Sequence, residues 1–287
     1  MTGTGQLMSS SEHEVWRKFI EDRCGIDFGE TRLQYLCRRL SERMRALNIT
    51  GFHRYYTYLN FNAEKEQEWQ KLLELLVVGE TSFFRHEGSF LALRNLVIPG
   101  LIARKQQTGN QVLTMWSAGC STGQEAYSMT MTVLELIDPQ KIQIETLGTD
   151  INETVLEKAR IGKYSPLAIR SLPTGYRKKY LTELRQDRET VYQINQRVRD
   201  RVRFGHHNLK TIEQNPVPGQ DVIFCQNALI YFTAECRNLV VQELCRCLSP
   251  GGYLFLAPGE IVGFKLPGIQ SVKVEDSLVF QRLPCWK

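Results

Sequence analysis

The chain lacks the sequence features of membrane, secreted and metal-binding proteins. No apolar run approaches the roughly 20 residues that a membrane-spanning helix needs, and residues 1–6 lack the basic cluster and apolar core of a signal peptide. The 8 cysteines are scattered without a C-x-x-C pair, and the 5 histidines do not gather around them. We therefore expect a cytoplasmic protein with reduced thiols and no bound metal.

Two common nucleotide-binding motifs are also missing. The glycine turn at residues 118–123 contains no G-x-G-x-x-G, and no lysine follows its second glycine, so neither pyrophosphate nor triphosphate binding is indicated. The turn does lie between an apolar run at 112–115 and a helical pattern, an arrangement that brings backbone close to a nucleotide-like ligand. Asp150 closes the next strand-like run, where an acid is placed to accept hydrogen bonds from ribose hydroxyls. A nucleoside without phosphates fits best, and S-adenosylmethionine is the common one.

Apolar periodicity divides the chain into a helical part and an α/β part. Before residue 80 we expect four helices and no strand: one opened by a capping box at Ser11 and ended by Gly25, one at 33–47, one capped by Thr50, and one through 69–76. The next helix should stop near Pro99. From residue 112 strands alternate with helices, which predicts a mostly parallel sheet covered on both faces. Its later elements are expected as strands at 221–225 and 253–257, a helix at 234–248, a turn at 250–252 and an antiparallel edge strand at 277–283.

The net charge of +5 conceals two basic blocks. Between residues 31 and 56 there are six arginines and one acid, and most of these arginines lie off the apolar stripe of the second helix. Residues 158–210 hold fourteen Lys and Arg against four acids. This second block also interrupts the strand–helix alternation with short strands at 191–195 and 198–204, so we expect a small β insertion there. Either block fits an acidic partner or an ordinary solvated face.

Four motifs, in this order, resemble the chemotaxis-receptor glutamate O-methyltransferases, the CheR family. They are Glu80-Thr81-x-Phe83-Phe84-Arg85, the Ser117 to Glu125 run, Gly148-Thr149-Asp150-Ile151, and Phe224-Cys225-x-Asn227-x-x-Ile230-Tyr231-Phe232. The resemblance covers nearly the whole chain. It implies an α/β fold of the class I S-adenosylmethionine-dependent methyltransferase type, Rossmann-like with a mostly parallel sheet. The implied parts are a helical N-terminal domain (1–78), a linker with the first helix of the catalytic domain (79–111), and a methyltransferase domain (112–287) with the β insertion at about 165–205.

The resemblance also assigns residues to roles. Arg85 and Tyr231 would lie closest to the transferred methyl group. The cofactor-binding set would be Thr81 and Arg85 at the methionyl end, Glu125 at its amino group, Ala118 in the turn, Asp150 on the ribose, and Asn208, Leu209, Gln226 and Asn227 around the adenosine. The receptor would dock on Arg32, Arg38, Arg39, Arg43 and Arg45. Two positions depart from the family, which usually has asparagine at Gly79 and arginine at Gln226, and this puts the cofactor affinity in doubt.

The implied activity transfers a methyl group from S-adenosylmethionine to glutamate carboxylates of methyl-accepting chemoreceptors, leaving S-adenosylhomocysteine, in bacterial sensory adaptation. A glutamate with a pKa near 4.3 is already an anion at neutral pH, so no general base is needed. The expected partner is the receptor's cytoplasmic helical bundle, approached by a monomer that meets the membrane only through the receptor. In some family members the insertion binds a receptor peptide by strand addition; here the charged loop at 185–189 lacks glycine, and we do not expect it.

Two other functions remain open at this point. The fourteen basic residues would suit a nucleic-acid methyltransferase, although residues 227–230 lack the Pro-Pro-aromatic run common in methylation of base amino groups, and we expect no nucleic acid. Gly79 and Gln226 would suit a non-catalytic S-adenosylmethionine-binding adaptor. The sequence does not reveal which receptor or which glutamates are modified, or which signalling output follows.

Overall fold

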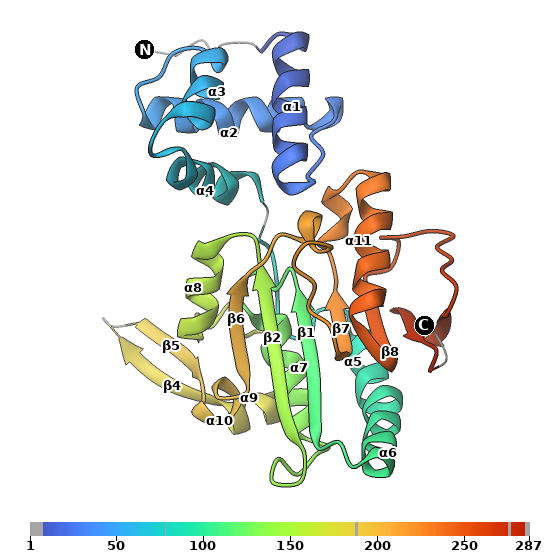
Figure 1. Cartoon of the computed structure of the whole chain (residues 1–287). Helices are drawn as coiled ribbons and strands as arrows, with labels where there is room; N and C mark the ends of the chain where they lie inside the picture. Colours follow the sequence, from blue (N-terminus) through green and yellow to red (C-terminus); the bar gives the residue numbers. More distant parts are fainter. Residues whose placement is uncertain (1–7, 78, 187–188, 275–276, 285–287) are drawn as a thin grey trace. The chain divides into compact units, whose positions relative to one another are not determined.

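The computed structural model describes residues 8–77, 79–186, 189–274 and 277–284. Contacts within the chain divide it into two compact units (Figure 1). The first comprises Met1–Gly79 with Tyr231–Thr233, and the second comprises Glu80–Ile230 with Ala234–Lys287. A short piece of the C-terminal half of the sequence therefore belongs to the N-terminal unit.

The first unit is helical in the part of it that the structure describes. Its α-helices are the four that the periodicity predicts: α1 (Ser10–Cys24), α2 (Leu33–Ala46), α3 (Phe52–Phe61) and α4 (Lys65–Leu76), with a short 3₁₀ turn η1 (Glu30–Arg32) before α2. Their apolar stripes meet in a core that includes Trp16, Leu36, Leu40, Tyr55 and Leu72, all of them buried. Amphipathic spacing alone is enough to specify this packing.

The starts of two of these helices differ from the prediction. The N-cap of α1 is Ser9, whose side chain accepts from the amide of Glu12 while Glu12 bonds back to Ser9, so the capping box begins two residues before Ser11. Gly51, with φ 93°, is the N-cap of α3, and no side chain caps that helix, so Thr50 does not fill this role. Gly25 ends α1 in the left-handed conformation, as predicted.

The second unit is built on a seven-stranded sheet of order β6-β2-β1-β7-β8-β10-β9. Strands β1 (Val112–Ala118), β2 (Gln143–Asp150), β6 (Val202–His206), β7 (Gln220–Cys225) and β8 (Leu248–Leu256) pair in parallel, whereas β10 (Ser277–Arg282) pairs antiparallel to β8 and to β9 (Ile269–Val274). The predicted mostly parallel sheet is therefore confirmed. Strand order reverses between β1 and β7, which is where open α/β sheets bind ligands.

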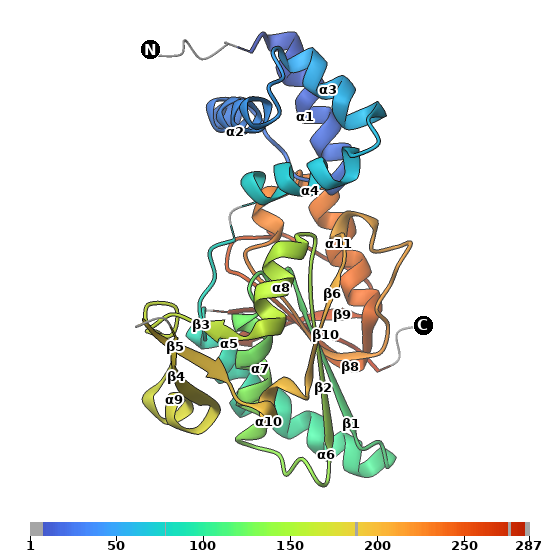
Figure 2. The same cartoon turned by 90° about the vertical axis from the view of Figure 1, so that its left-hand side faces the viewer.

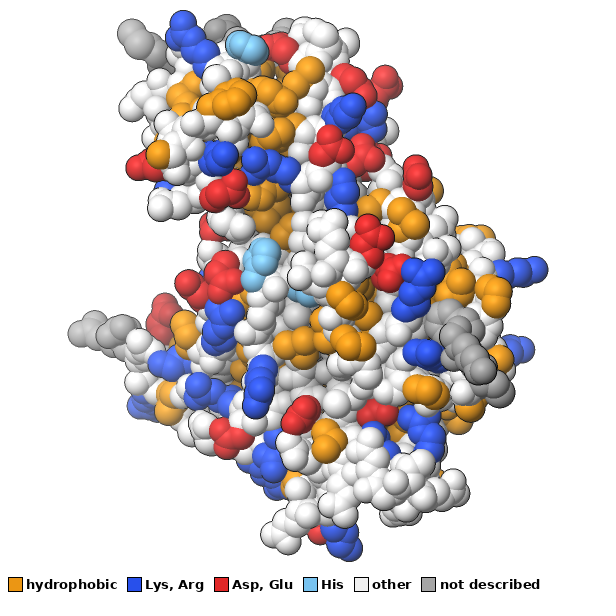
Figure 3. Space-filling view, viewed as in Figure 1, with side chains coloured by type: hydrophobic (Ala, Val, Ile, Leu, Met, Phe, Trp, Pro, Cys, Tyr) orange, Lys and Arg blue, Asp and Glu red, His pale blue; other side chains and the backbone are white. Residues whose placement is uncertain are grey.

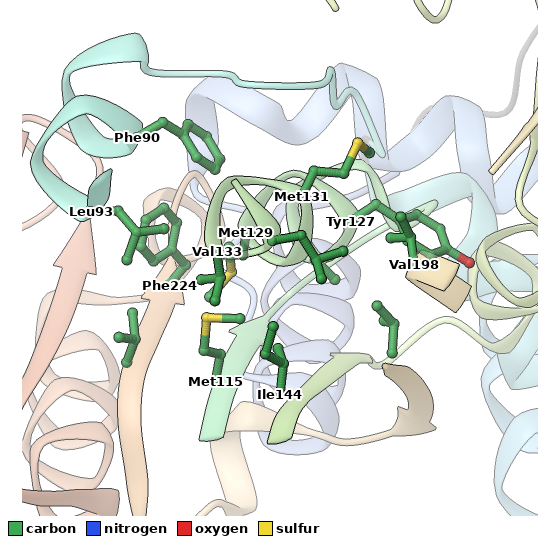
Figure 4. Close-up of a cluster of buried hydrophobic side chains, with 14 of the residues drawn as sticks. Phe90, Leu93, Met115, Tyr127, Met129, Met131, Val133, Ile144, Val198 and Phe224 are labelled. Atoms are coloured by element: carbon green, nitrogen blue, oxygen red, sulfur yellow. The ribbon is translucent and has the colours of Figure 1, made fainter. Parts of the chain in front are cut away.

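Helices cover both faces of this sheet. α7 (Gln124–Leu134) and α8 (Glu153–Ile161) lie over one face and α11 (Ala234–Cys247) over the other (Figure 2). The core lies where α7 meets the strands: Met129 and Val133 of the helix pack with Met115 of β1, Ile144 of β2 and Phe224 of β7, all fully or nearly fully buried (Figure 4). This burial fixes the position of α7 and of the glycine turn that precedes it.

The helix expected to stop near Pro99 continues past it. α5 (Glu87–Ala92) passes through a π-helical turn, η2 (Leu93–Val97), into α6 (Ile98–Thr108), and Pro99 occupies the first turn of α6. A proline there removes an amide that would lack an intrahelical partner at a helix start. The wider π turn restarts the hydrogen-bond pattern, so the proline does not end the helix.

The inserted sheet ends earlier in the chain than predicted. It has three strands in the order β3-β5-β4, namely β3 (Lys163–Tyr164), β4 (Leu181–Gln186) and β5 (Glu189–Ile194), with α9 (Thr174–Tyr180) between β3 and β4. The strand predicted at 191–195 is confirmed as part of β5. The one predicted at 198–204 is wrong as an insertion strand, because Val198 lies in helix α10 (Gln196–Arg199) and β6 pairs with β2 in the large sheet. Residues 187–188 of the charged loop lie outside the described residues.

Two predictions near the C-terminus need correction. β10 is antiparallel, but it lies inside the sheet because β9 pairs along its outer side. Residues 250–252 form a bulge within β8 rather than a turn before it: Gln220 pairs with Leu248 and Val222 with Tyr253. A Cβ at Gly252 would lie 2.9 Å from the carbonyl oxygen of Gln220, which explains the glycine. No helix in the described ranges is long and apolar enough to cross a membrane.

Candidate functional site

The glycine turn joins the end of β1 to the start of α7. The amides of Gly119 and Cys120 both donate to the carbonyl oxygen of Thr149 on β2, each at 2.8 Å, so the turn is tied to the neighbouring strand. Gly119 has φ 84°, and a Cβ there would meet the Cβ of Ala228 at 2.9 Å. Glycine is therefore required at this position both by conformation and by space. Ala118, the last residue of β1, is fully buried beside it.

Asp150 ends β2 at the same edge of the sheet. Its Oδ2 accepts from the amide of Ser121 at 2.9 Å and its Oδ1 from the amide of Asn152 at 3.0 Å. The side chain is 8% exposed. Burial raises the pKa of Asp150, and the backbone donors of Asn152, Ser121 and Ile151 oppose that shift. Each carboxylate oxygen retains a lone pair for a further donor, as a ribose diol would supply.

Glu125 lies in the first turn of α7 and is half-buried. Its Oε1 accepts from the hydroxyl of Ser117 at 2.7 Å. Burial raises the pKa of Glu125 to about 8; the Ser117 hydroxyl and the positive charge of Arg85 oppose the rise, and the negative charge of Glu260 adds to it. A positively charged ligand beside this carboxyl would favour its ionised form, and the carboxylate would in turn attract the ligand.

Arg85 lies near the end of a loop, residues 80–86, that precedes α5. The buried Phe83 packs edge-on against Tyr164 of β3, and its carbonyl oxygen accepts from Ser171 at 2.9 Å. The amide of Phe84 donates to Ser128 of α7 at 3.1 Å. Nη1 of Arg85 donates to the carbonyl oxygen of Glu80 at 2.8 Å, so the guanidinium folds back over the half-buried Thr81 segment. The loop is therefore held by the inserted sheet on one side and by α7 on the other.

The segment after β7, residues 226–230, carries two further predicted site residues. Gln226 is 6% exposed, and its Nε2 donates to the hydroxyl of Ser89 at 2.8 Å, so its side chain points toward α5. Asn227 has φ 61°, and its Oδ1 accepts from Nε2 of His86 at 2.7 Å. Glu260, 1% exposed, accepts from the amide of Leu229 at 3.0 Å, and this bond holds the segment in place.

Asn208 and Leu209 follow β6, whose last residue, His206, pairs with Asp150. The side chain of Asn208 accepts from the amide of Lys210 and starts the 3₁₀ turn η3 (Leu209–Thr211), in which Leu209 is buried. The amide of His207 donates to the carbonyl oxygen of Asp150 at 3.0 Å. The predicted residues Ala118, Glu125, Asp150, Asn208, Gln226 and Asn227 thus follow strand ends at one edge of one sheet.

Most of the chain matches the CheR methyltransferases. Residues 11–77 match the family's all-alpha domain and residues 79–273 match its SAM-binding domain. The chain belongs to the CheR methyltransferase family. It is 33% identical over 247 residues to chemotaxis protein methyltransferase 2 of Vibrio cholerae, covering 85% of this chain and 83% of that protein. It is 30% identical over 284 residues to chemotaxis protein methyltransferase Cher2 of Pseudomonas putida, covering 97% and 98% respectively.

The site of this CheR family member fits S-adenosylmethionine, the cofactor of the family. A ligand's amino group would find the half-buried carboxyl of Glu125, and a diol would find two acceptor oxygens on Asp150. The protein is accordingly an S-adenosylmethionine-dependent methyltransferase. Among the described residues, no group of three or more His, Cys, Asp and Glu side chains is arranged to hold a metal ion.

Tyr231, the second residue that the CheR resemblance places near the transferred methyl group, is grouped with the helical unit. Its carbonyl oxygen accepts from the amide of Asp27 at 2.8 Å, and the guanidinium carbon of Arg32 lies 5.3 Å from its ring centre. Phe232 next to it forms a β-bridge with Ile26. The chain therefore carries Tyr231 only one residue beyond the 226–230 segment, at the point where it enters the other unit.

The five predicted docking arginines of this CheR chain have different surroundings. Arg38 and Arg45 are exposed on α2. Arg32 lies over Phe28 at 4.7 Å, and Arg39 lies over Tyr35 at 4.9 Å while pairing with Glu42. Arg43 makes two bonds to the buried Glu68, of 2.9 and 2.7 Å, and Glu68 also accepts from Tyr55. This ion pair gives Arg43 a structural role, and its part in docking stays a prediction.

Sequence reasoning did not single out His86 or Glu260. Within the described residues the non-glycine positions with positive φ are Asn48, Phe84, His86, Ser121 and Asn227, and four of these five lie in the segments that form the site. Strain of this kind persists only where the surroundings impose it, and it gathers at functional sites. No pattern in a single sequence marks a histidine for a left-handed conformation, so only the structure reveals it.

Proposed function

We propose that this protein methylates glutamate side-chain carboxylates of methyl-accepting chemoreceptors, producing glutamyl methyl esters and S-adenosylhomocysteine. The observation that supports the proposal is that the loop carrying Arg85 is bonded to α7, the helix that begins beside Glu125: the amide of Phe84 donates to Ser128 at 3.1 Å. A guanidinium there is suited to receive an anionic acceptor, because it forms paired hydrogen bonds with a carboxylate. The named relatives in V. cholerae and P. putida are chemotaxis protein methyltransferases, which supports a receptor as substrate.

Each residue of the site has one proposed task. Glu125 holds the amino group of the cofactor, Thr81 lies at its methionyl end, and Asp150 accepts from its ribose hydroxyls. Asn208, Leu209, Asn227 and the Ala118 backbone line the adenosine. Gln226 contributes through its backbone, because its side-chain amide is engaged with Ser89. These assignments leave Arg85 and Tyr231 to orient the acceptor.

The chemistry needs alignment and no proton transfer. The bound cofactor supplies a methyl group on a positively charged sulfur. As a carboxylate oxygen of the acceptor forms its bond to the methyl carbon, the carbon–sulfur bond breaks and its electron pair returns to sulfur. Holding the carboxylate in line with that bond is worth up to roughly 7–11 kcal/mol of the barrier. Nη1 of Arg85 already donates to the carbonyl oxygen of Glu80, so fewer of its donors are available to bind the acceptor carboxylate.

The helical unit is the proposed docking part. Arg38 and Arg45 are exposed on α2, and they would attract the acidic surface of a receptor's helical bundle. We propose that the protein acts as a monomer and binds no nucleic acid. Lys and Arg side chains also gather over β4, β5 and β6, with acidic side chains among them (Figure 3). On α9, between β3 and β4, Lys179 pairs with Glu135 and Arg177 lies over the ring of Tyr192.

The deciding experiment labels receptor-containing membranes with a radioactive methyl donor. We expect label on a receptor band, release of that label as methanol in mild alkali, and a loss of about 100-fold in rate for Arg85→Ala. Arg170→Ala, at an exposed arginine of the insertion, is the matched control and should keep the wild-type rate. Alkali-stable label, or label on RNA or DNA, would overturn the proposal.

A further inference from the structure

Two side-chain bridges join the start of α5 to the residues after β7. Nε2 of His86 donates to Oδ1 of Asn227 at 2.7 Å. One helical turn further, Nε2 of Gln226 donates to the hydroxyl of Ser89 at 2.8 Å. The Ser89 hydroxyl is also 2.7 Å from that of Ser277 on β10, so the inner bridge is anchored in the sheet. The outer bridge, at His86, is the one adjacent to Arg85.

Both residues of the outer bridge hold a strained backbone. His86 has φ 61° and ψ 70° and is the N-cap of α5 without making a side-chain cap. Asn227 also has φ 61°, and Phe84, two residues before His86, has φ 52°. A non-glycine residue in this region costs of order 1 kcal/mol or more, so these conformations persist only because contacts elsewhere impose them. The His86–Asn227 bond is one such contact, and it joins the 80–86 loop to the 226–230 segment.

The bridge also completes the support of the 80–86 loop. The loop is tied to α7 through Phe84 and to the insertion through Phe83, both on the N-terminal side of Arg85. On the C-terminal side, His86 is the first residue after Arg85 whose side chain bonds to another element. Without that bond the next side-chain tie on the C-terminal side of Arg85 is the Ser89–Gln226 bridge, one helical turn further along the chain.

We propose that His86 is a positioning residue for methyl transfer: through Asn227 it sets the distance between Arg85 and the adenosine end of the cofactor site. The inference deepens the proposed function and rests on it for the role of Arg85. His86 touches neither the cofactor nor the acceptor in this role. Its loss therefore acts on the alignment of the acceptor carboxylate, which governs kcat, more than on cofactor binding.

The test compares His86→Gly, Asn227→Gly and the double variant. Glycine accepts a φ of +61° without strain, so both variants retain the backbone. His86→Gly removes the bridge, whereas Asn227→Gly removes the bridge together with a side chain proposed to line the adenosine. We expect His86→Gly to lower kcat by about 10- to 100-fold, since misplacement by 1 Å can cost that much, and to change the Kd for S-adenosylhomocysteine by less than about 5-fold. The double variant should lose no more kcat than Asn227→Gly alone, because the bridge can be removed only once.

Hydrogen exchange gives a readout that needs no acceptor protein. In His86→Gly the amides of residues 80–86 and 226–230 should exchange faster, while those of α8 should not change. His53→Gly, at an exposed histidine of α3, serves as the histidine control and should leave exchange in the second unit unaltered. A wild-type kcat in His86→Gly, additive losses in the double variant, or unchanged exchange in both segments would each overturn the proposal. A wild-type enzyme that makes no base-labile ester would instead count against the proposed function.

Discussion

The amide of Ser121 donates to Oδ2 of Asp150 at 2.9 Å, and this hydrogen bond ties the glycine turn after β1 to the end of β2. Ser121 reaches this position by adopting φ 48°. The bond means that the acid expected to bind ribose also orders the turn expected to approach the cofactor. Ligand affinity and local stability therefore depend on the same carboxylate.

Asp150→Asn tests that dual dependence. The amide retains one acceptor oxygen, but its NH₂ group faces one of the two backbone donors and can no longer accept from a ribose hydroxyl. We expect the Kd for S-adenosylhomocysteine to rise by about 10- to 100-fold, equivalent to about 1.4–2.7 kcal/mol, as measured by titration calorimetry. Asp138→Asn, at an exposed carboxyl that accepts from the amide of Gln140, is the control and should bind normally. Equal affinities would show that Asp150 does not contact the ligand.

Glu125 should make cofactor affinity depend on pH. Its pKa of about 8 without ligand means that the carboxyl is mostly protonated at pH 6. An ammonium group favours the ionised form, so binding below pH 8 must release a proton. We expect affinity for S-adenosylhomocysteine to increase by up to about 50-fold from pH 6 to pH 8, as the ionised fraction of Glu125 rises from about one in a hundred to about one half. Binding heats in buffers of different ionisation enthalpy should show the released proton. Glu125→Gln should bind weakly at both pH values with no proton release.

The same carboxyl should lower stability at higher pH. Its pKa rises from 4.5 in the unfolded chain to about 8 in the folded one, so between these values the folded state holds a proton that the unfolded state has lost. The contribution of Glu125 to stability is thus complete below about pH 4.5 and declines as pH rises toward 8. At pH 8 the ligand-free Glu125→Gln variant should melt on the order of 2–4 °C higher than wild type. A lower melting temperature would contradict the assigned shift.

Two glycines offer a matched pair. Gly119→Ala would place its Cβ 2.9 Å from that of Ala228 at a φ of 84°. We expect it to destabilise the second unit by about 1–3 kcal/mol and to weaken ligand binding. Gly100 lies within α6 with nothing within 4 Å of an added Cβ. Gly100→Ala should stabilise by about 0.5–1 kcal/mol. Denaturant unfolding checks both, and a neutral Gly119→Ala would show that the turn can relax.

The arginines of α2 should separate into structural and docking residues. Arg43→Met leaves the buried Glu68, 3% exposed in its side chain, with only the Tyr55 hydroxyl. It should destabilise the helical unit by up to about 3 kcal/mol. Arg38→Glu and Arg45→Glu should leave stability unchanged within about 0.5 kcal/mol. They should instead raise the receptor KM and reduce its dependence on salt. A receptor KM unaffected by these reversals would place docking elsewhere.

Much of this arrangement could be predicted from local sequence. The apolar stripe of α2 specifies a helix with Leu36 and Leu40 inside, and a strand–turn–helix pattern specifies the turn at Gly119. The predictions that were wrong concern segments whose local sequence pattern fits two structures equally well. The alternation in Val202–His206 suits an edge strand in either sheet, and only pairing with β2 decides which. Pro99 suits a helix end or a helix start, and the π turn before it decides in favour of a start.

The sequence by itself determined that strands ending in Ala118, Asp150 and Cys225 would bring a glycine turn, an acid and a polar segment to one edge, because parallel strands share the direction of their carboxyl ends. The tertiary structure alone decided which polar side chains, at this edge and in the helical unit, are engaged with one another. Glu68 engages Arg43, Ser89 engages Gln226, and His86 engages Asn227. Each of these bonds joins residues at least 25 positions apart, and partners at such separations are set by the packing of whole elements, which no local pattern encodes.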